Sequence, residues 1–416
     1  MRFLANGPDL PDELLVARDE GRVLFFCGAG VSRARAGLPG FLGLAERVLS
    51  ELRALPDSPA HKLVDIAKRL EKERIRGVGG ILAADRVFGL LERDFALTDI
   101  ELAVGQALRP ADDADLDAHR TLLELSRGPD GQTQIVTTNF DLLFEAAAPK
   151  LTRWTPRELP DLRRNERFAG IVHLHGMFDD AYTRPVGGNL VLSSAEFGRA
   201  YLAEGWATAF IREAIARYLI VFVGYTADDP PVQYLLEALH RTAEHSSHDL
   251  YAFQEGREDE AKTLWRHKGV TAIPYAPDKD HQALWETLAA WSDRARDPEK
   301  WRNRLIVRAL SGPEGMAPHE RGQVVHLAGT PDGARGLAEA KKTIPATWLC
   351  AFDPTIRYGT PGQVELFKPG SLSVDPFALY AIDSDPSYCQ GTIPRSIRPP
   401  MADTTHADAT DAVSKT

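Results

Sequence analysis

The chain has 416 residues and 44% hydrophobic content, enough for two or three domains with a sizeable core. Its net charge of −10, from 59 acidic and 49 basic residues, argues against charge-driven binding to nucleic acid. The cysteines, Cys27, Cys350 and Cys389, are too scattered for a disulfide framework, which favours a reducing cytoplasm. No apolar segment is long enough for a signal peptide or a membrane span, so we expect no membrane association.

The N-terminal third pairs a buried strand with a long helical run. Val23 to Cys27 is a short apolar run that breaks into Gly28-Ala-Gly30, and we expect a helix beyond Pro39. From residue 42 to about 125, apolar residues recur at helical spacing. This run is too long for one crossover helix, so we interpret 42–130 as a helical insertion that caps the strand ends.

The middle of the chain alternates strands and helices. This alternation predicts an α/β fold, a Rossmann-like parallel sheet, formed by residues 1–41 and 131–296. Dense Pro and Gly punctuation then predicts a small helical appendage at 297–358 and an extended to disordered tail at 359–416. The strands are expected at 134–138, 171–174, 190–192, 219–223, 249–253 and 270–274. The helices are expected from 141 to 148, 197 to 218, 261 to 267 and 281 to 294.

Polar or glycine-bearing motifs end four of the predicted strands. Besides Gly28-Ala-Gly30, they are Thr137-Thr-Asn-Phe-Asp141, His173-Leu-His-Gly176 and Val221-Phe-Val-Gly-Tyr225. In an open parallel sheet, ligands bind at the carboxyl ends of the strands. Glycine there permits a tight turn and close approach of backbone to a ligand. We therefore expect one ligand-binding crevice, although Gly28-Ala-Gly30 alone is equally consistent with a plain turn.

Together these motifs resemble the sirtuin superfamily. Gly28-Ala-Gly-Val-Ser32, Gly37-Leu-Pro39 with Phe41, Thr138-Asn-Phe-Asp141 and His175-Gly176 occur in the family's order, within roughly residues 20–255. The resemblance is strongest to the bacterial sirtuin-like NAD hydrolases of anti-phage defence. It implies a sirtuin-type fold and an NADase that cleaves NAD to nicotinamide and ADP-ribose. Such an enzyme acts as a gated effector of abortive infection by depleting NAD.

The resemblance assigns catalysis to Asn139 and His175. A carboxamide can orient water or a ribose hydroxyl, and a histidine can accept the proton. The alternative for His175 is a strand-end histidine bonded to backbone. His173 would share its face of the strand, but the family's catalytic histidine directly precedes glycine. Asp141 is expected either to act at the site or to cap the following helix.

A further set of residues is expected to bind NAD. Ser32 and the amides of Gly28–Gly30 are expected to face phosphate, and Gly224-Tyr225 resembles a glycine turn near the adenosine ribose. Thr138 stands where sirtuin deacetylases usually carry glutamine, and Leu42 stands where many carry arginine. The full set is Gly28, Ala29, Gly30, Ser32, Pro39, Phe41, Thr138, Gly224 and Tyr225.

The chain lacks the zinc module of sirtuin deacetylases. No cysteine lies between His175 and Cys350, so the four-cysteine site cannot form and we expect no metal. This disfavours the alternatives of a protein deacylase or an ADP-ribosyl transferase. A non-catalytic module that senses NAD or ADP-ribose is a further alternative. Expected partners are further copies of the chain in a homo-oligomer, an ATPase or Argonaute-type defence protein, or a phage trigger. Residues 299–355 resemble a segment that follows the sirtuin-like domain in some longer bacterial proteins.

Overall fold

The chain divides into two compact units. The computed structural model describes residues 1–72, 84–164, 167–227, 229, 232, 250–266, 268–313, 315–345 and 348. The sheet unit comprises Ala17–Gln282, and the helical unit comprises Met1–Val16 with the chain from Ala283 onward. The predicted tail at 359–416 and part of the predicted appendage at 297–358 lie outside the described residues. The domain boundaries proposed from the sequence stay a prediction.

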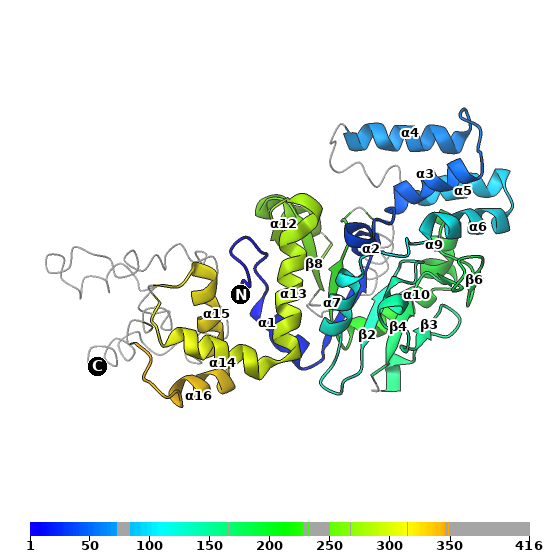
Figure 1. Cartoon of the computed structure of the whole chain (residues 1–416). Helices are drawn as coiled ribbons and strands as arrows, with labels where there is room; N and C mark the ends of the chain where they lie inside the picture. Colours follow the sequence, from blue (N-terminus) through cyan, green and yellow to red (C-terminus); the bar gives the residue numbers. More distant parts are fainter. Residues whose placement is uncertain are drawn as a thin grey trace. The chain divides into compact units, whose positions relative to one another are not determined.

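A seven-stranded parallel sheet forms the centre of the sheet unit (Figure 1). Its strand order is β3-β4-β2-β1-β7-β8-β9. Every residue of β1 and β7 is buried, as expected for strands with both faces covered. This architecture confirms the predicted α/β, Rossmann-like fold class. The strands are β1 (Val23–Cys27), β2 (Gln134–Thr137), β3 (Arg153–Trp154), β4 (Gly170–His173), β7 (Leu219–Val223), β8 (Leu250–Glu255) and β9 (Thr271–Tyr275).

The carboxyl ends of the four central strands are aligned. Cys27 of β1 pairs with Thr137 of β2 on one side and with Val223 of β7 on the other. Thr137 in turn pairs with His173 of β4. Because the chain passes to one side of β1 first and to the other side later, β1 marks the topological switch point of the sheet. Ligands bind at such a point in open α/β sheets.

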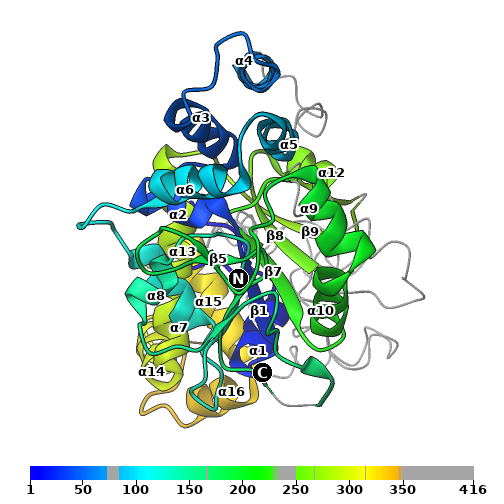
Figure 2. The same cartoon turned by 90° about the vertical axis from the view of Figure 1, so that its right-hand side faces the viewer.

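Helices cover both faces of the sheet. α7 (Asp117–Leu125) and α8 (Leu143–Ala147) lie on one side of the strands, and α10 (Trp206–Ile215) lies on the other (Figure 2). The core on the α10 side includes Phe26, Phe222 and Trp265, and Phe222 stacks on Trp265. The described residues of this part of the chain also form η2 (Leu162–Arg164), α12 (Glu258–Arg266), η4 (Lys279–His281) and α13 (Gln282–Arg296). By contact clustering, Gln282 belongs to the sheet unit and the rest of α13 to the helical unit.

β1 is followed immediately by a helix that we did not predict from the sequence. α2 (Ala29–Ala36) begins immediately after Gly28, whereas we expected helix only beyond Pro39. Gly28 is extended and Gly37 adopts a left-handed conformation with φ 68°, so glycines bound this short helix. α2 therefore carries Ser32 past the end of β1, and a second helix begins only at Phe41.

The described part of the insertion between α2 and α7, which leaves out residues 73–83, contains four helices: α3 (Phe41–Glu51), α4 (Pro59–Lys72), α5 (Ala84–Asp94) and α6 (Leu97–Leu108). Figure 1 shows them gathered together at one end of the sheet unit. Their apolar faces share one core with Phe140, Met177 and Phe178, which follow β2 and β4. One face of the insertion thus packs on the loops beyond these strand ends. α7, the last helix of the predicted helical run, packs instead against α2 and α8.

Two predicted elements differ in the structure. Residues 190–192 form no strand, and a small antiparallel hairpin, β5 (Met177–Phe178) with β6 (Pro185–Val186), follows Gly176 instead. The single helix predicted at 197–218 is broken into α9 (Ser194–Gly198), a π-helical turn η3 (Arg199–Ala203) and α10. Gly205, at φ 67°, separates the last two because a left-handed residue cannot continue a helix.

The described part of the helical unit is built from short helices. α14 (Pro298–Ala309), α15 (Pro318–Ala328) and α16 (Pro331–Ala338) each begin with proline, which suits the first helical position. α1 (Asp12–Asp19) begins in this unit and ends in the sheet unit. Trp348 is buried, and its indole N–H donates to the Ala309 carbonyl at 2.8 Å. None of the helices in the described ranges is both long and apolar enough to cross a bilayer.

Candidate functional site

The residues predicted to act at the site follow the aligned strand ends closely. Asn139 and His175 each lie two positions beyond the paired residues Thr137 and His173. Gly28–Gly30 follow Cys27, and Gly224-Tyr225 follow Val223, on the two strands that pair at that same level. Pro39 and Phe41 come from the turn after α2 and the start of α3, and both are partly buried. The sheet topology therefore brings the four predicted motifs to one edge.

Ser32 is the centre of a buried polar cluster. Its Oγ donates to Asp141 Oδ2 at 2.9 Å and accepts from Asn139 Nδ2 at 3.1 Å. The same Nδ2 donates to the Gly28 carbonyl at 3.2 Å. Asp141 also accepts from the Leu143 amide in the first turn of α8, so it bonds Ser32 and that turn together. Burial raises the pKa of Asp141, and the hydrogen bonds from Ser32 and Leu143 only partly oppose this.

A buried acid–histidine pair supports the backbone of Asn139. His173 Nε2 lies 2.7 Å from Glu145 Oε1, and His173 Nδ1 lies 3.3 Å from the Asn139 carbonyl oxygen. His173 is fully buried and Glu145 nearly so. Burial raises the pKa of Glu145, but the interactions with His173, a backbone hydrogen bond and Arg153 together outweigh it, so the net shift is downwards. His173 therefore holds the turn that carries Asn139.

His175 lies in aromatic surroundings. Its Nε2 is 2.8 Å from the Tyr201 hydroxyl of η3, and the Phe197 ring meets it edge-on at 5.2 Å between centroids. Only 1% of His175 is exposed, and this burial lowers its pKa to about 3. Burial also raises the pKa of Tyr201, so the phenol stays protonated. His175 is therefore a neutral imidazole at physiological pH.

Phe41 links the insertion to these aromatic rings. It stacks on Phe88 of α5 at 5.5 Å and meets Phe197 edge-on at 6.4 Å. Phe197 in turn contacts both His175 and Tyr201. The predicted site residue Phe41 thus belongs to an apolar wall that runs from α5 to His175.

The glycines at the ends of β1 and β7 allow two turns to touch. A Cβ on Gly30 would lie 2.7 Å from Gly224 Cα, and one on Gly28 would lie 2.8 Å from the Gly224 oxygen. The Gly28 amide donates to the Val223 carbonyl and the Gly30 amide to the Gly224 carbonyl, each at 2.9 Å. These two amides, which we expected to face phosphate, are engaged within the protein. Ala29, between them, is partly exposed.

Thr138 and Tyr225 also meet where the turn after β1 contacts the turn after β7, a contact that we call the glycine seam. Thr138 Oγ1 is 2.8 Å from the Tyr225 hydroxyl, which donates to the Cys27 carbonyl at 3.2 Å. Burial raises the pKa of Tyr225 well above its ordinary value, so it acts as a neutral hydroxyl. The two side chains join the ends of β2, β1 and β7, and nine-tenths or more of each residue is buried.

Three residues that contact the predicted site residues or His173 were not identified from the sequence. His119 of α7 contacts Ser32 at 3.3 Å, Tyr201 contacts His175, and Glu145 contacts His173. Tyr201 follows Phe197 at helical spacing, a signal that could have marked a shared face. His119 and Glu145 carry no local motif, because only the packing of α7 and α8 on the sheet brings them to the site.

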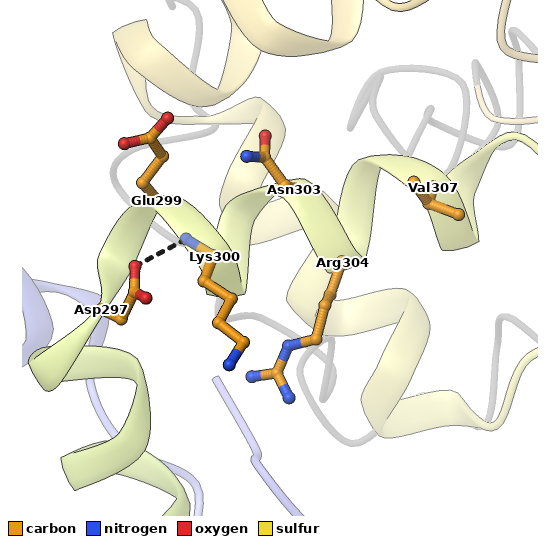
Figure 3. A pocket seen from close by; sticks show the side chains of 6 residues that line it. All are labelled: Asp297, Glu299, Lys300, Asn303, Arg304 and Val307. Atoms are coloured by element: carbon orange, nitrogen blue, oxygen red, sulfur yellow. Dashed lines mark hydrogen bonds between the residues drawn. The ribbon is translucent and has the colours of Figure 1, made fainter.

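No metal centre is visible among the residues that the structure describes: no group of three potential His, Cys, Asp or Glu ligands occurs there. In the helical unit, a depression of about 580 Å³ lies along α14 and is lined by Asp297, Glu299, Lys300, Asn303, Arg304 and Val307 (Figure 3). In Figure 3 the Asp297 side chain caps the helix by accepting from the Lys300 amide. This depression belongs to a different unit from the strand-end residues.

Residues 133–273 match the family model of the SIR2-like domain. The match supports the resemblance to the sirtuin superfamily over this segment, which contains Asn139, His175 and Tyr225. Over 329 residues the chain is 32% identical to "Uncharacterized protein y4cA" of Sinorhizobium fredii (strain NBRC 101917 / NGR234). That alignment covers 75% of this chain but 26% of the relative, so the chain spans about a quarter of the relative's length.

Among solved structures, one described as "Structural Basis for the Mechanism and Regulation of Sir2 Enzymes" matches with 14% identity and a TM-score of 0.35. The match covers 68% of this chain and 96% of that chain.

Proposed function

We propose that this protein hydrolyses NAD to nicotinamide and ADP-ribose. The observation that carries the proposal is the alignment of Asn139 and His175, each two residues beyond one level of the sheet at its switch point. The SIR2-like domain match over this segment supports an enzyme that uses NAD. A defence role through NAD depletion rests on the sequence motifs alone.

The proposed chemistry is a displacement at the anomeric carbon of the nicotinamide ribose. The bond from this carbon to the nicotinamide nitrogen breaks, and its electron pair neutralises the pyridinium. Water then forms the new bond to the carbon, oriented by the carboxamide of Asn139. Attack on an oxocarbenium-like centre leaves a strongly acidic proton on the water oxygen. Even a weakly basic imidazole such as His175, with its pKa near 3, can assist its removal.

We further propose that access to the site is gated. Asn139 is 8% exposed and His175 is 1% exposed, so groups that cover them must move before NAD reaches them. Phe197 and Tyr201 cover His175, and Phe41 connects them to the insertion. Assembly into oligomers that repositions the insertion would supply such a gate. Light scattering beside the NAD assay tests this: a strict monomer with concentration-independent specific activity would contradict it.

The acceptor requirement tests the proposed reaction against its alternatives. Purified protein is incubated with NAD alone, and in parallel with NAD and an acetyl-lysine peptide. We expect nicotinamide release at the same rate in both, with ADP-ribose as the other product. Release only with the peptide would indicate a deacylase, and label from NAD on protein would indicate a transferase. Tight NAD binding without turnover would indicate a sensing module.

A further inference from the structure

We propose that His119 is a positioning residue, which holds Ser32 so that the Asn139 carboxamide presents its oxygen to the substrate. The proposal concerns the site of the proposed NAD hydrolysis and rests on that function for its catalytic consequence. It is carried by the directions of the hydrogen bonds around Ser32.

The Gly28 carbonyl fixes which way the Asn139 amide faces. A carbonyl oxygen can only accept, so the atom of Asn139 that lies 3.2 Å from it must be the nitrogen, Nδ2. The second hydrogen of Nδ2 points to Ser32 Oγ at 3.1 Å. Both donors of the carboxamide are therefore used within the protein. Oδ1, which no other group in the described ranges bonds, is left to accept from a water or a ribose hydroxyl.

Ser32 must then act as an acceptor toward Asn139. A serine hydroxyl has one hydrogen, and the one on Ser32 goes to Asp141 Oδ2 at 2.9 Å. Its two lone pairs are left for Asn139 Nδ2 and for His119 Nε2, which lies 3.3 Å away. With Asp141 as a carboxylate, which can only accept, the arrangement is consistent only if His119 carries its proton on Nε2 and donates it to Ser32. The opposite tautomer would aim a lone pair at the serine oxygen.

The surroundings of His119 favour a neutral ring with that tautomer. The residue is fully buried, and burial lowers its pKa to about 4. The edge of its ring packs against Phe144 at 4.8 Å between centroids. Its other nitrogen, Nδ1, is buried without a hydrogen-bond partner in the described ranges. An unpaired lone pair at Nδ1 leaves no buried hydrogen unsatisfied, whereas a proton there would.

The consequence is that the Asn139 carboxamide is already oriented before the substrate binds. If the His119 bond is lost, the Ser32 hydroxyl can rotate, and its hydrogen can compete for the position that Asn139 Nδ2 needs. The carboxamide would then sample orientations that present its nitrogen. Such a change should lower the rate of the chemical step and leave NAD binding nearly unchanged.

The tautomer can be measured without any activity assay. Long-range ¹H–¹⁵N spectra of the full chain, labelled with ¹⁵N-histidine, distinguish the two neutral forms. The His119 signal is assigned as the one that disappears in His119→Gln. We expect the Nε2–H form, and observation of the Nδ1–H form would overturn the proposal.

Matched variants test the effect on catalysis. Glutamine can place an amide N–H where Nε2 lies, whereas asparagine reaches only about as far as Nδ1. We expect His119→Asn and His119→Phe to lower kcat about tenfold, the value of one hydrogen bond, with KM for NAD changed less than about twofold. His119→Gln should recover most of kcat. Thermal midpoints of all variants are measured in parallel.

The two proposals fail separately. A wild-type protein that leaves NAD intact contradicts the proposed function, while its histidine spectrum still decides the tautomer. An active protein in which His119→Phe keeps wild-type kcat, or in which His119→Gln is as slow as His119→Asn, overturns the role of His119.

Discussion

The two halves of the strand-end site are held in opposite ways. On the Asn139 side, Ser32 of α2 bonds Asn139 and Asp141 of the loop between β2 and α8, and it contacts His119 of α7. On the His175 side, the ring bonds the Tyr201 hydroxyl and meets the Phe197 ring edge-on, and no other hydrogen bond reaches it from the described residues. One half is a polar network, and the other is an aromatic pocket in which the imidazole bonds the Tyr201 hydroxyl.

This difference assigns a different property to each half. A connected hydrogen-bond network fixes the direction of a side chain, because each bond constrains the next. An apolar pocket instead fixes the protonation state, since burial disfavours the charged ring. In the proposed reaction, the first half would orient the nucleophile, and the second would keep the imidazole neutral.

The largest expected effect is on turnover. Asn139→Ala and His175→Ala should each lower NAD cleavage about 10²–10⁴-fold, as for loss of a group that orients or deprotonates the nucleophile. Circular dichroism should stay native-like. Arg120→Ala, an exposed position on α7, serves as the control and should keep full activity. If either variant is folded like the wild type and keeps wild-type turnover, the catalytic role assigned to that residue is wrong.

Acid should destabilise both halves through their histidines. The folded-state pKa values of His175 and His119, about 3 and 4, lie below the unfolded value of about 6.5. The unfolded state therefore binds more protons, so this contribution is fully present above pH 6.5 and decreases as pH falls toward 4. From pH 7 to pH 5 each histidine should cost about 2 kcal/mol of unfolding free energy. Urea denaturation should show His119→Gln losing about 2 kcal/mol less than wild type, and equal losses would contradict the buried neutral ring.

The glycine seam tests how the strand ends are held together. Gly224→Ala would place a Cβ 2.6 Å from the Val31 amide at a residue with φ 75°. We expect a loss of about 2–4 kcal/mol in unfolding free energy. The alanine would adopt an unfavourable positive φ, and the neighbouring backbone would also have to move to make room for its Cβ. Gly37→Ala is the matched control, with φ 68° but open space around the new Cβ, and should cost about 1–2 kcal/mol. Equal losses would show that conformation, and not close approach, accounts for Gly224.

The smallest expected effect sharpens the His175 half. Tyr201→Phe removes only the hydroxyl that bonds Nε2. We expect a loss of about 1 kcal/mol in stability and of about tenfold in NAD cleavage, since the imidazole loses the hydrogen bond to the Tyr201 hydroxyl. Thermal unfolding and initial rates measure both. Unchanged activity would mean that packing by Phe197 alone positions the imidazole.

The sequence predicted the sheet better than the site's supporting residues. Apolar runs such as Leu219–Val223 marked buried strands, and strand-end motifs placed Asn139 and His175 together because parallel strands end at one edge. Hydrophobic periodicity did not predict helix boundaries that depend on glycine conformation. Examples are α2, which glycines bound at both ends, and the interruption at Gly205. His119 lies 87 residues from Ser32, a contact that only tertiary packing creates.

The most direct test of the account is product analysis with purified protein and NAD alone. Mass spectrometry over a time course follows NAD, nicotinamide and ADP-ribose for the wild type and for Asn139→Ala. We predict that the wild type releases nicotinamide and ADP-ribose in equal amounts without any acceptor, and that the variant releases neither above background. Intact NAD with the wild type under every assembly condition, or equal release by both proteins, would contradict the proposed hydrolase.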